Sequence, residues 1–568
     1  MNINIKNNGF AKHESLLTRA INERLPENAD FELFIELDID ESIGKEESFK
    51  IVNKNGTWSI VGSDSLGLYF GIGKFLRTAT WHKTSVEPKE TDGVITPDCP
   101  FRATYFSVHF HNWYHEAPTE ELIRYTEDVL LSGYNTIFCI FPIVNMSNFD
   151  DENYHMFREK TRTVYKIAKD LGMKIGTIIN PNQGLKTTPE RFAADPSCYE
   201  GRTGGGGKNI CPEIDGALEY LRGLWQKVFE QYTDIGLDYI MTFPYDEGGC
   251  GCPKCMPWGA KGFPTLSKKL YEDALPYYPN AKFILCTWYF DEKYAEPWEL
   301  GEFKGLYERL RGDMSYADML MCDSHNDFPH YPLEHEVIKP IINFPEISMY
   351  GLRSWGGRGA NPLPKRFQRI WESSKRVLSG GMPYSEGLYE DILKFQCSGY
   401  YWNKEAHYKD ILAEYISYEY SDKVVDEVIE MMELIEFNHV GVREDREPDL
   451  DAARRAERIA RAVDTKLPER AKNAWRWRIL YIRAIIDRMV YEYHEENCKG
   501  QEKAIHEIWQ TREHYLYNDE AQELLQELCR YYHTIDKEKG KNHWTFPPVK
   551  DGKVYTSNSG KQRDRGRN

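Results

Sequence analysis

The chain has 568 residues, of which 41% are hydrophobic, so it is too long for one ordinary core and predicts two or three buried domains. Its net charge of −17, from 89 acidic and 72 basic residues, disfavours a nucleic-acid partner because phosphate neutralisation needs a basic face. There is no run of about 18 apolar residues and no basic segment followed by an apolar one at the start, so we expect no membrane partner. Several of the twelve cysteines lie in apolar runs, so we expect reduced thiols and a cytoplasmic location.

Residues 1–98 predict a small α/β domain. The helical pattern HESLLTRAINERL is followed by an alternating strand, FELFIELDI, and then by two short strands joined at Asn55-Gly56, a dipeptide typical of hairpins. The segment SLGLYFGIGKFLRTA again has helical spacing. Pro97 and Pro100 mark the end of this domain.

Residues 99–405 predict a catalytic domain in which strands alternate with helices. Mostly apolar runs, nearly all followed by an amphipathic segment, place the strands at 102–110, 135–142, 173–180, 237–244, 282–289, 317–324, 347–355 and 380–387. Eight such units indicate an α/β fold of the (β/α)8 TIM barrel type. An open doubly wound sheet is disfavoured because the first strand lacks the glycine-rich turn that binds a dinucleotide.

Residues 406–550 predict a C-terminal helical domain, because apolar residues recur there at helical spacing and strand patterns are missing. Residues 551–568 are polar and basic, and we expect them to be disordered. A homodimer is left open.

The catalytic residues of such a barrel lie at the carboxyl ends of its strands. A composition of 14% aromatic residues suits a protein that stacks rings against flat apolar faces such as those of a carbohydrate. Polar and aromatic residues at the predicted strand ends are the candidates for substrate binding: His109, His111, Asn112, Asn180, Tyr245, Trp288, Asp323, Trp355 and Glu386. No lysine stands at the centre of this mouth, which disfavours a Schiff-base enzyme and a phosphate site.

Two adjacent carboxylates, Asp246 and Glu247, follow the fourth predicted strand and precede Gly248 and Gly249, which permit an irregular turn. Adjacent side chains point in different directions, so one acid can donate a proton while the other binds another part of the substrate. Their closeness raises the pKa of one of them, which suits a general acid near neutral pH.

Further motifs accompany this acid pair. They are GLYFGIGKFLR at the end of the first domain, PDCPFRATYFSVHFHNWYHEAPTEELIRYTEDVLLSGYNTI at the opening of the barrel, and YSEGLYEDILKF at its eighth strand. Over residues 55–400 the chain resembles the glycoside hydrolases related to families 20, 84, 67 and 163. The resemblance implies substrate-assisted, retaining removal of a β-linked N-acetylhexosamine, with no catalytic cofactor. Asp246 would orient the 2-acetamido group, and Glu247 would protonate the leaving oxygen and later deprotonate water.

The sequence departs from this pattern, and other readings stay open. Where family 20 has a sugar-binding arginine, the chain reads SVHFHNW, so His111 and Asn112 take that role or the sugar differs. Glu386 is a further carboxylate that, with Glu247, would suit a two-carboxylate mechanism on a uronide or an N-glycan antenna. His109 and His111 form the H-x-H of metal-dependent amidohydrolases, but the rest of that motif set is missing. A noncatalytic carbohydrate-binding protein is the third class.

The cysteines behind the acid pair are a candidate metal site. Cys250, Cys252 and Cys255 have C-x-C-x2-C spacing, and Cys211, in NICPEID, is a possible fourth ligand for a structural zinc. The alternative is a set of reduced thiols that pack a tight loop. An iron–sulfur cluster is disfavoured because the run lacks the C-x2-C-x2-C spacing.

Overall fold

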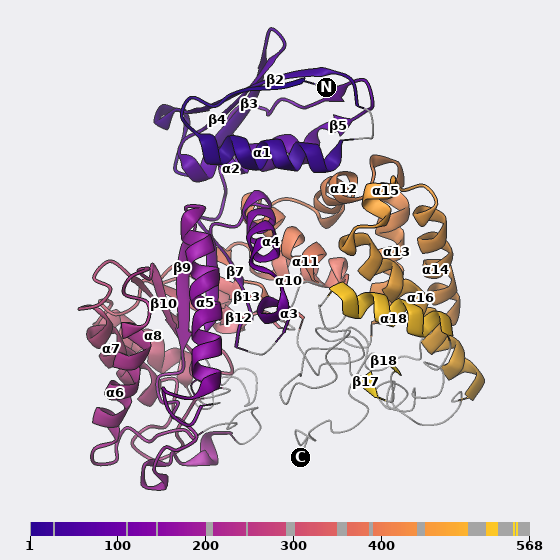
Figure 1. The fold of residues 1–568 in the computed structure, drawn as a ribbon. Coiled ribbons are helices and arrows are strands. Elements are labelled where there is room, and N and C mark those ends of the chain that lie inside the picture. The colour runs from indigo at the N-terminus through magenta and orange to yellow at the C-terminus, as the bar shows by residue number, and fades with distance from the viewer. Residues whose placement is uncertain are drawn as a thin grey trace.

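The fold has an N-terminal α/β domain, a closed parallel barrel and a set of C-terminal helices (Figure 1). A computed structural model describes residues 2–25, 29–109, 112–141, 143, 146–199, 208–245, 248–290, 301–325, 327–348, 360–385, 390–439, 449–497, 519–531, 549–550 and 553–554. Within these residues, none of the helices is long and apolar enough to cross a membrane.

The N-terminal domain is a four-stranded sheet with two helices on the face turned toward the barrel (Figure 1). The sheet order is β1 (Asn2–Lys6), β2 (Glu32–Ile39), β4 (Thr57–Gly62) and β3 (Phe49–Lys54), and the helices are α1 (Ala11–Arg24) and α2 (Ser65–Thr78). The predicted hairpin is confirmed: β3 and β4 pair antiparallel through Asn55 and Gly56, which have φ of 54° and 90°. β1 was not predicted. A short hairpin, β5 (Thr80–Trp81) with β6 (Val86–Glu87), follows.

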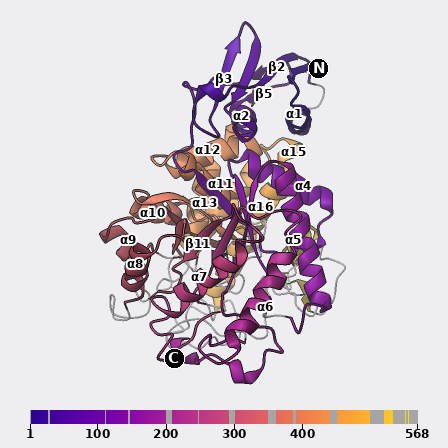
Figure 2. The same cartoon turned by 90° about the vertical axis from the view of Figure 1, so that its left-hand side faces the viewer.

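Eight parallel strands close the barrel, which confirms the predicted fold class. They are β7 (Phe101–Tyr105), β8 (Thr136–Ile140), β9 (Lys174–Ile179), β10 (Tyr239–Thr242), β11 (Lys282–Cys286), β12 (Met319–Asp323), β13 (Ile341–Phe344) and β15 (Leu378–Gly381). Helices surround them (Figure 2): α3 (Trp113–Glu116), α4 (Thr119–Leu131), α5 (Glu152–Asp170), α6 (Ala217–Glu230), α7 (Gly262–Ala274), α8 (Glu302–Gly312), α9 (His330–Glu334), α10 (Pro364–Ser374) and α11 (Asp391–Trp402).

The interior of the barrel is a separate apolar cluster. Alternate residues of each strand face it, as Tyr239 and Met241 do on β10 and Met319 and Met321 on β12. The residues between them face the helices, so both faces of the strands are buried, as expected for parallel strands covered by helices.

The last two barrel strands differ from the prediction. The seventh strand is Ile341–Phe344 rather than 347–355, and the eighth is Leu378–Gly381 rather than 380–387. Pro345 and Pro383 follow these strands, and proline cannot donate a hydrogen bond to the ladder. Beyond the two prolines, β14 (Glu346–Ser348) and β16 (Tyr384–Ser385) pair as a small parallel sheet of their own.

The C-terminal helices pack mainly on their neighbours in the chain. They are α12 (Tyr408–Glu419), α13 (Val425–Asn438), α14 (Leu450–Asp464), α15 (Glu469–Lys472), α16 (Trp475–Asn497) and α18 (Asp519–Tyr531), followed by the hairpin β17 (Val549–Lys550) and β18 (Lys553–Val554). β18 lies in the stretch that was predicted to be disordered, and the remainder of 551–568 lies outside the described residues.

A buried charge joins the N-terminal domain to the barrel. Arg102 at the start of β7 is fully buried and pairs with Glu47. Its Nε and Nη1 donate to the carbonyls of Gly133 and Cys99, each at 2.8 Å. Asn135 donates to both carboxylate oxygens of Glu47 at 3.1 and 3.0 Å. Because these contacts lie at the amino end of β7, they stabilise the end of the barrel opposite to the mouth.

Candidate active site

The mouth of the barrel contains the predicted catalytic loop. β10 is the fourth barrel strand and ends at Thr242, so the acid pair comes four and five residues after it. Asp246 and Glu247 themselves lie outside the described residues, as do three of the substrate-binding candidates, His111, Trp355 and Glu386.

Inward-facing positions change from apolar to polar at the carboxyl ends of the strands. Side chains alternate along a strand, so Asn180 continues the inward series of Ile178. In the same way Asp323 continues that of Met321, and Glu346 that of Phe344. All three polar side chains are buried. These three positions therefore offer two carboxylates and one amide to the mouth.

Asp323 and Glu346 enclose a histidine. Asp323 contacts Nδ1 of His325, and Glu346 contacts Nε2 of the same ring. Burial alone would lower the pKa of His325, but the two carboxylates raise it to about 9. The imidazole is therefore an imidazolium near neutral pH, held by two acids from neighbouring strands.

Trp288, after β11, packs into this group. Its indole stacks on His325 with ring centroids 5.3 Å apart and planes 16° apart, and it also contacts Tyr289, Phe243 and Phe344. The side chain is therefore mostly covered, with 8% exposed. One face of the indole is already occupied by the ring of His325.

Asn180 and Trp288 each place at the mouth a buried polar atom that has no hydrogen-bond partner among the described residues. The two atoms are Oδ1 of Asn180, an acceptor, and Nε1 of Trp288, a donor. A buried polar group without a partner costs about 1–3 kcal/mol, so such atoms point to a ligand or a water that completes them. A donor and an acceptor together suit the hydroxyl groups of a sugar.

The first strand contributes an aromatic group. Tyr105 Oη lies 2.5 Å from Nδ1 of His109 and its ring stacks on Tyr384 at 4.9 Å. Burial lowers the pKa of His109 to about 3, so this imidazole is neutral. Asn112 caps α3: its Oδ1 accepts from the Tyr114 N–H at 3.0 Å, and its Nδ2 donates to the carbonyl of Ser107 at 2.7 Å.

Tyr245 anchors the loop that follows β10. It is fully buried, and its hydroxyl donates to the carboxylate of Glu302, which also accepts from the N–H of Gly259 at 3.0 Å. The indole of Trp258 donates to the carbonyl of Pro244 at 2.6 Å. The residue before the acid pair is thus held from α8 and from within the loop.

Asn182 holds the same loop from the side of β9. Its fully buried amide donates to the carbonyls of Ile210 and Gly249, at 3.1 and 2.8 Å, and accepts from the N–H of Gly249 at 2.9 Å. Gly249, two residues after Glu247, is therefore linked through Asn182 to the segment that contains Ile210.

The structure brings the four predicted cysteines together. The sulfurs of Cys211, Cys250, Cys252 and Cys255 all lie within 4.8 Å of one another. Cys252 is partly exposed, and the other three are buried.

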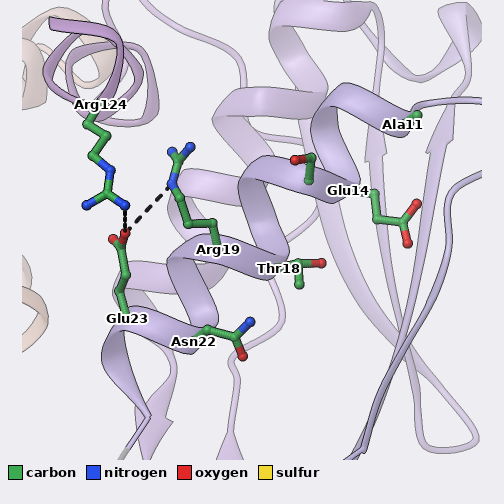
Figure 3. A pocket seen from close by; sticks show the side chains of 8 residues that line it. Ala11, Glu14, Thr18, Arg19, Asn22, Glu23 and Arg124 are labelled. Carbon is green, nitrogen blue, oxygen red and sulfur yellow. Dashed lines mark ion pairs between the residues drawn. The ribbon is translucent and has the colours of Figure 1, made fainter. Parts of the chain in front are cut away.

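A depression on the N-terminal domain has a different character. It is lined by exposed and half-buried residues of α1 and by Arg124 of α4, and Arg19 and Arg124 both pair with Glu23 (Figure 3). No aromatic ring lines it. It lacks the buried acids and the rings that gather at the barrel mouth.

Glu346 was missed as a site residue because the seventh strand was placed after it. The apolar run PIINFP, bounded by prolines, was the signal for the true strand, and Glu346 directly follows it. His325 was also not among the predicted site residues, since sequence spacing does not reveal that two acids would flank it.

No family model matches the chain, and no curated protein matches it in sequence. Solved structures do match. One is a family 89 glycoside hydrolase from Clostridium perfringens in complex with GlcNAc-α-1,4-galactose, with a TM-score of 0.55 and 11% identity over 92% of this chain. The match spans only 65% of that chain, just under two thirds of its length.

Two further matches are enzymes of other families. A family 138 enzyme that targets pectin rhamnogalacturonan II has a TM-score of 0.53 and 10% identity, over 94% of this chain and 91% of the other. A family 115 4-O-methyl-α-glucuronidase has a TM-score of 0.57 and 11% identity, over 96% and 77%. The fold is thus similar to that of several glycoside hydrolase families. A family 20 β-N-acetylglucosaminidase and a family 84 enzyme match at 0.46 and 0.47, too low to carry an argument.

Proposed function

We propose that this protein is a glycoside hydrolase whose acid/base is Glu247, with Asp246 beside it. The observation that carries the proposal is position: the pair follows the fourth of eight barrel strands, at a mouth where buried carboxylates, rings and unpartnered polar atoms gather. In a (β/α)8 barrel this end of the strands is where catalysis takes place. The similarity in fold to glycoside hydrolases supports the same class of reaction.

For the substrate we propose a β-linked N-acetylhexosamine. The carbonyl oxygen of the 2-acetamido group, oriented by Asp246, attacks the anomeric carbon as the glycosidic bond breaks and Glu247 protonates the leaving oxygen. Glu247 then takes a proton from water, which attacks the same carbon and opens the oxazolinium ring. This route needs no protein nucleophile.

A second candidate is favoured by Glu346. It is a buried carboxylate after the seventh strand, and it contacts Nε2 of His325. A two-carboxylate mechanism would use Glu247 as acid and an ionised partner, Glu346 or the predicted Glu386, on a sugar without an acetamido group. Hydrolysis with retention or inversion would depend on the separation of the two groups.

Assays on a panel of aryl glycosides distinguish the substrate-assisted mechanism from the two-carboxylate mechanism. The first mechanism requires that N-acetylhexosaminides be cleaved and the matching hexosides and uronides be left intact, and that Asp246→Asn lose most activity. Cleavage of uronides or plain hexosides, with a greater loss in Glu346→Gln than in Asp246→Asn, would support the second mechanism. If chelator abolished turnover while Glu247→Gln kept it, a metal-dependent hydrolase would replace both. Sugar binding without any turnover would favour a binding protein.

A further inference from the structure

The four-cysteine cluster joins two loops of the barrel mouth. Cys250, Cys252 and Cys255 lie between β10 and α7, and Cys211 lies between β9 and α6, some forty residues earlier in the chain. The Cys211 and Cys252 sulfurs are 3.7 Å apart. A disulfide needs about 2.05 Å, so the two sulfurs are not bonded. Four thiolates around a tetrahedral zinc, with Zn–S of ~2.3 Å, stand ~3.8 Å apart.

Packing alone does not account for this arrangement. Thiols elsewhere in the described chain, such as Cys139 in β8 and Cys397 in α11, are buried singly among apolar side chains. Four sulfurs gathered from two loops form instead a closed set of soft ligands. Thiolate ligands of this kind select zinc over the harder cations, and four protein ligands leave no open position for a substrate.

We propose that Cys211, Cys250, Cys252 and Cys255 bind one Zn²⁺ as four thiolates, and that this structural ion fastens the loop after β10 to the segment before α6. Binding releases the protons of those cysteines that are still thiols, without any redox step. Hydrogen bonds already join the same two regions: Gly251 N–H donates to the carbonyl of Asp195 at 2.8 Å, and the side-chain amide of Asn182 bridges the carbonyls of Ile210 and Gly249. The ion would add a further link between the loop after β10 and the segment before α6, which these hydrogen bonds already hold together.

The site would act on catalysis only through position. Cys250 comes three residues after Glu247, so movement of the cysteine loop moves the acid pair. This consequence rests on the proposed function, whereas the metal site itself does not. The ion touches no substrate in this proposal, and the cysteines are positioning residues.

Metal analysis of the full-length protein, purified without chelator, tests the site. We expect about one zinc per chain and little iron. Cys252→Ser, at the most exposed of the four positions, should cut the bound zinc at least tenfold, whereas Cys397→Ser in α11 should keep it. In the Cys252→Ser protein we also expect faster tryptic cleavage next to Lys254 and Lys261, because the loop is released.

A second measurement keeps the proposal testable if the variant fails to fold. Wild-type protein grown with Co²⁺ in place of zinc should show the intense sulfur-to-metal bands of a tetrahedral tetrathiolate site. Wild-type protein that holds neither zinc nor cobalt, zinc that persists unchanged in Cys252→Ser, or iron in place of zinc would overturn the proposal. Zinc without any glycosidase activity would overturn the proposed function alone, and activity without zinc would overturn this site alone.

Discussion

Replacement of Asn182 by alanine tests whether the loop that carries the acid pair is held as the structure indicates. The change removes three hydrogen bonds, of 2.8 to 3.1 Å, and leaves the Gly249 N–H and the Gly249 and Ile210 carbonyls without partners. Each buried polar group left unpaired costs about 1–3 kcal/mol, and water that enters the space left by the amide offsets part of this. We therefore expect a loss of about 3 kcal/mol in the free energy of unfolding in urea denaturation.

The same change should act on catalysis, because Gly249 stands two residues after Glu247. A displacement of about 1 Å in a catalytic group costs about 10²-fold, so we expect kcat on an aryl glycoside to fall roughly 10- to 100-fold. Asn135→Ala is the matched control, since it is an equally buried asparagine at the opposite end of the barrel. It should lose similar stability and keep kcat. The reasoning would be refuted if Asn182→Ala had the same kcat as the wild type, or if Asn182→Ala and Asn135→Ala lost kcat equally.

Three further changes probe the rest of the structure. The pKa of His325 is raised from 6.5 to about 9, so between these pH values the folded protein keeps a proton that the unfolded chain releases. The stability of the wild type should therefore fall as the pH rises from about 6.5 to 9. In thermal melts, His325→Gln should reduce this dependence of stability on pH. Trp288→Phe keeps a ring but removes the unpartnered Nε1, so kcat/KM should fall about tenfold with little change in melting temperature; an unchanged kcat/KM would exclude a bond to substrate. Arg102→Met leaves Glu47 buried without its charge partner and should cost about 3–5 kcal/mol in urea, part of which the added change Glu47→Gln should recover; a loss under 1 kcal/mol would contradict this account.

The barrel could be predicted because its signals are local. Each strand is a short apolar run and each helix has its own periodicity, so the fold class and six of the eight strands were placed within a few residues. The eighth strand was extended past Gly381 into β16, and the seventh was misplaced because 347–355, like the true strand, contains strand-forming residues such as Ile347, Tyr350 and Trp355. Only the proline at 345 distinguished the two runs.

The site was only partly predictable for a similar reason. Strand order brings Cys211 to the other cysteines, and this neighbourhood could be inferred from topology alone. The contacts of His325 with Asp323 and Glu346 could not, because they depend on side-chain directions at two strand ends. Asn112 and Tyr245 were predicted to bind substrate, and the structure shows that their side chains also make hydrogen bonds within the protein. Asn112 accepts from the Tyr114 N–H, and Tyr245 donates to Glu302.

The most direct test of the central claim is the dependence of Glu247→Gln on the leaving group. The account predicts that this variant loses about 10²–10⁴-fold in kcat/KM on a β-N-acetylhexosaminide with a poor leaving group, which needs a proton, and far less on an activated aryl glycoside. It also predicts that the alkaline limb of the pH profile, set by the acid, disappears. Equal losses on both substrates with an unchanged pH profile, or wild-type activity in the variant, would contradict the assignment of Glu247 as acid/base.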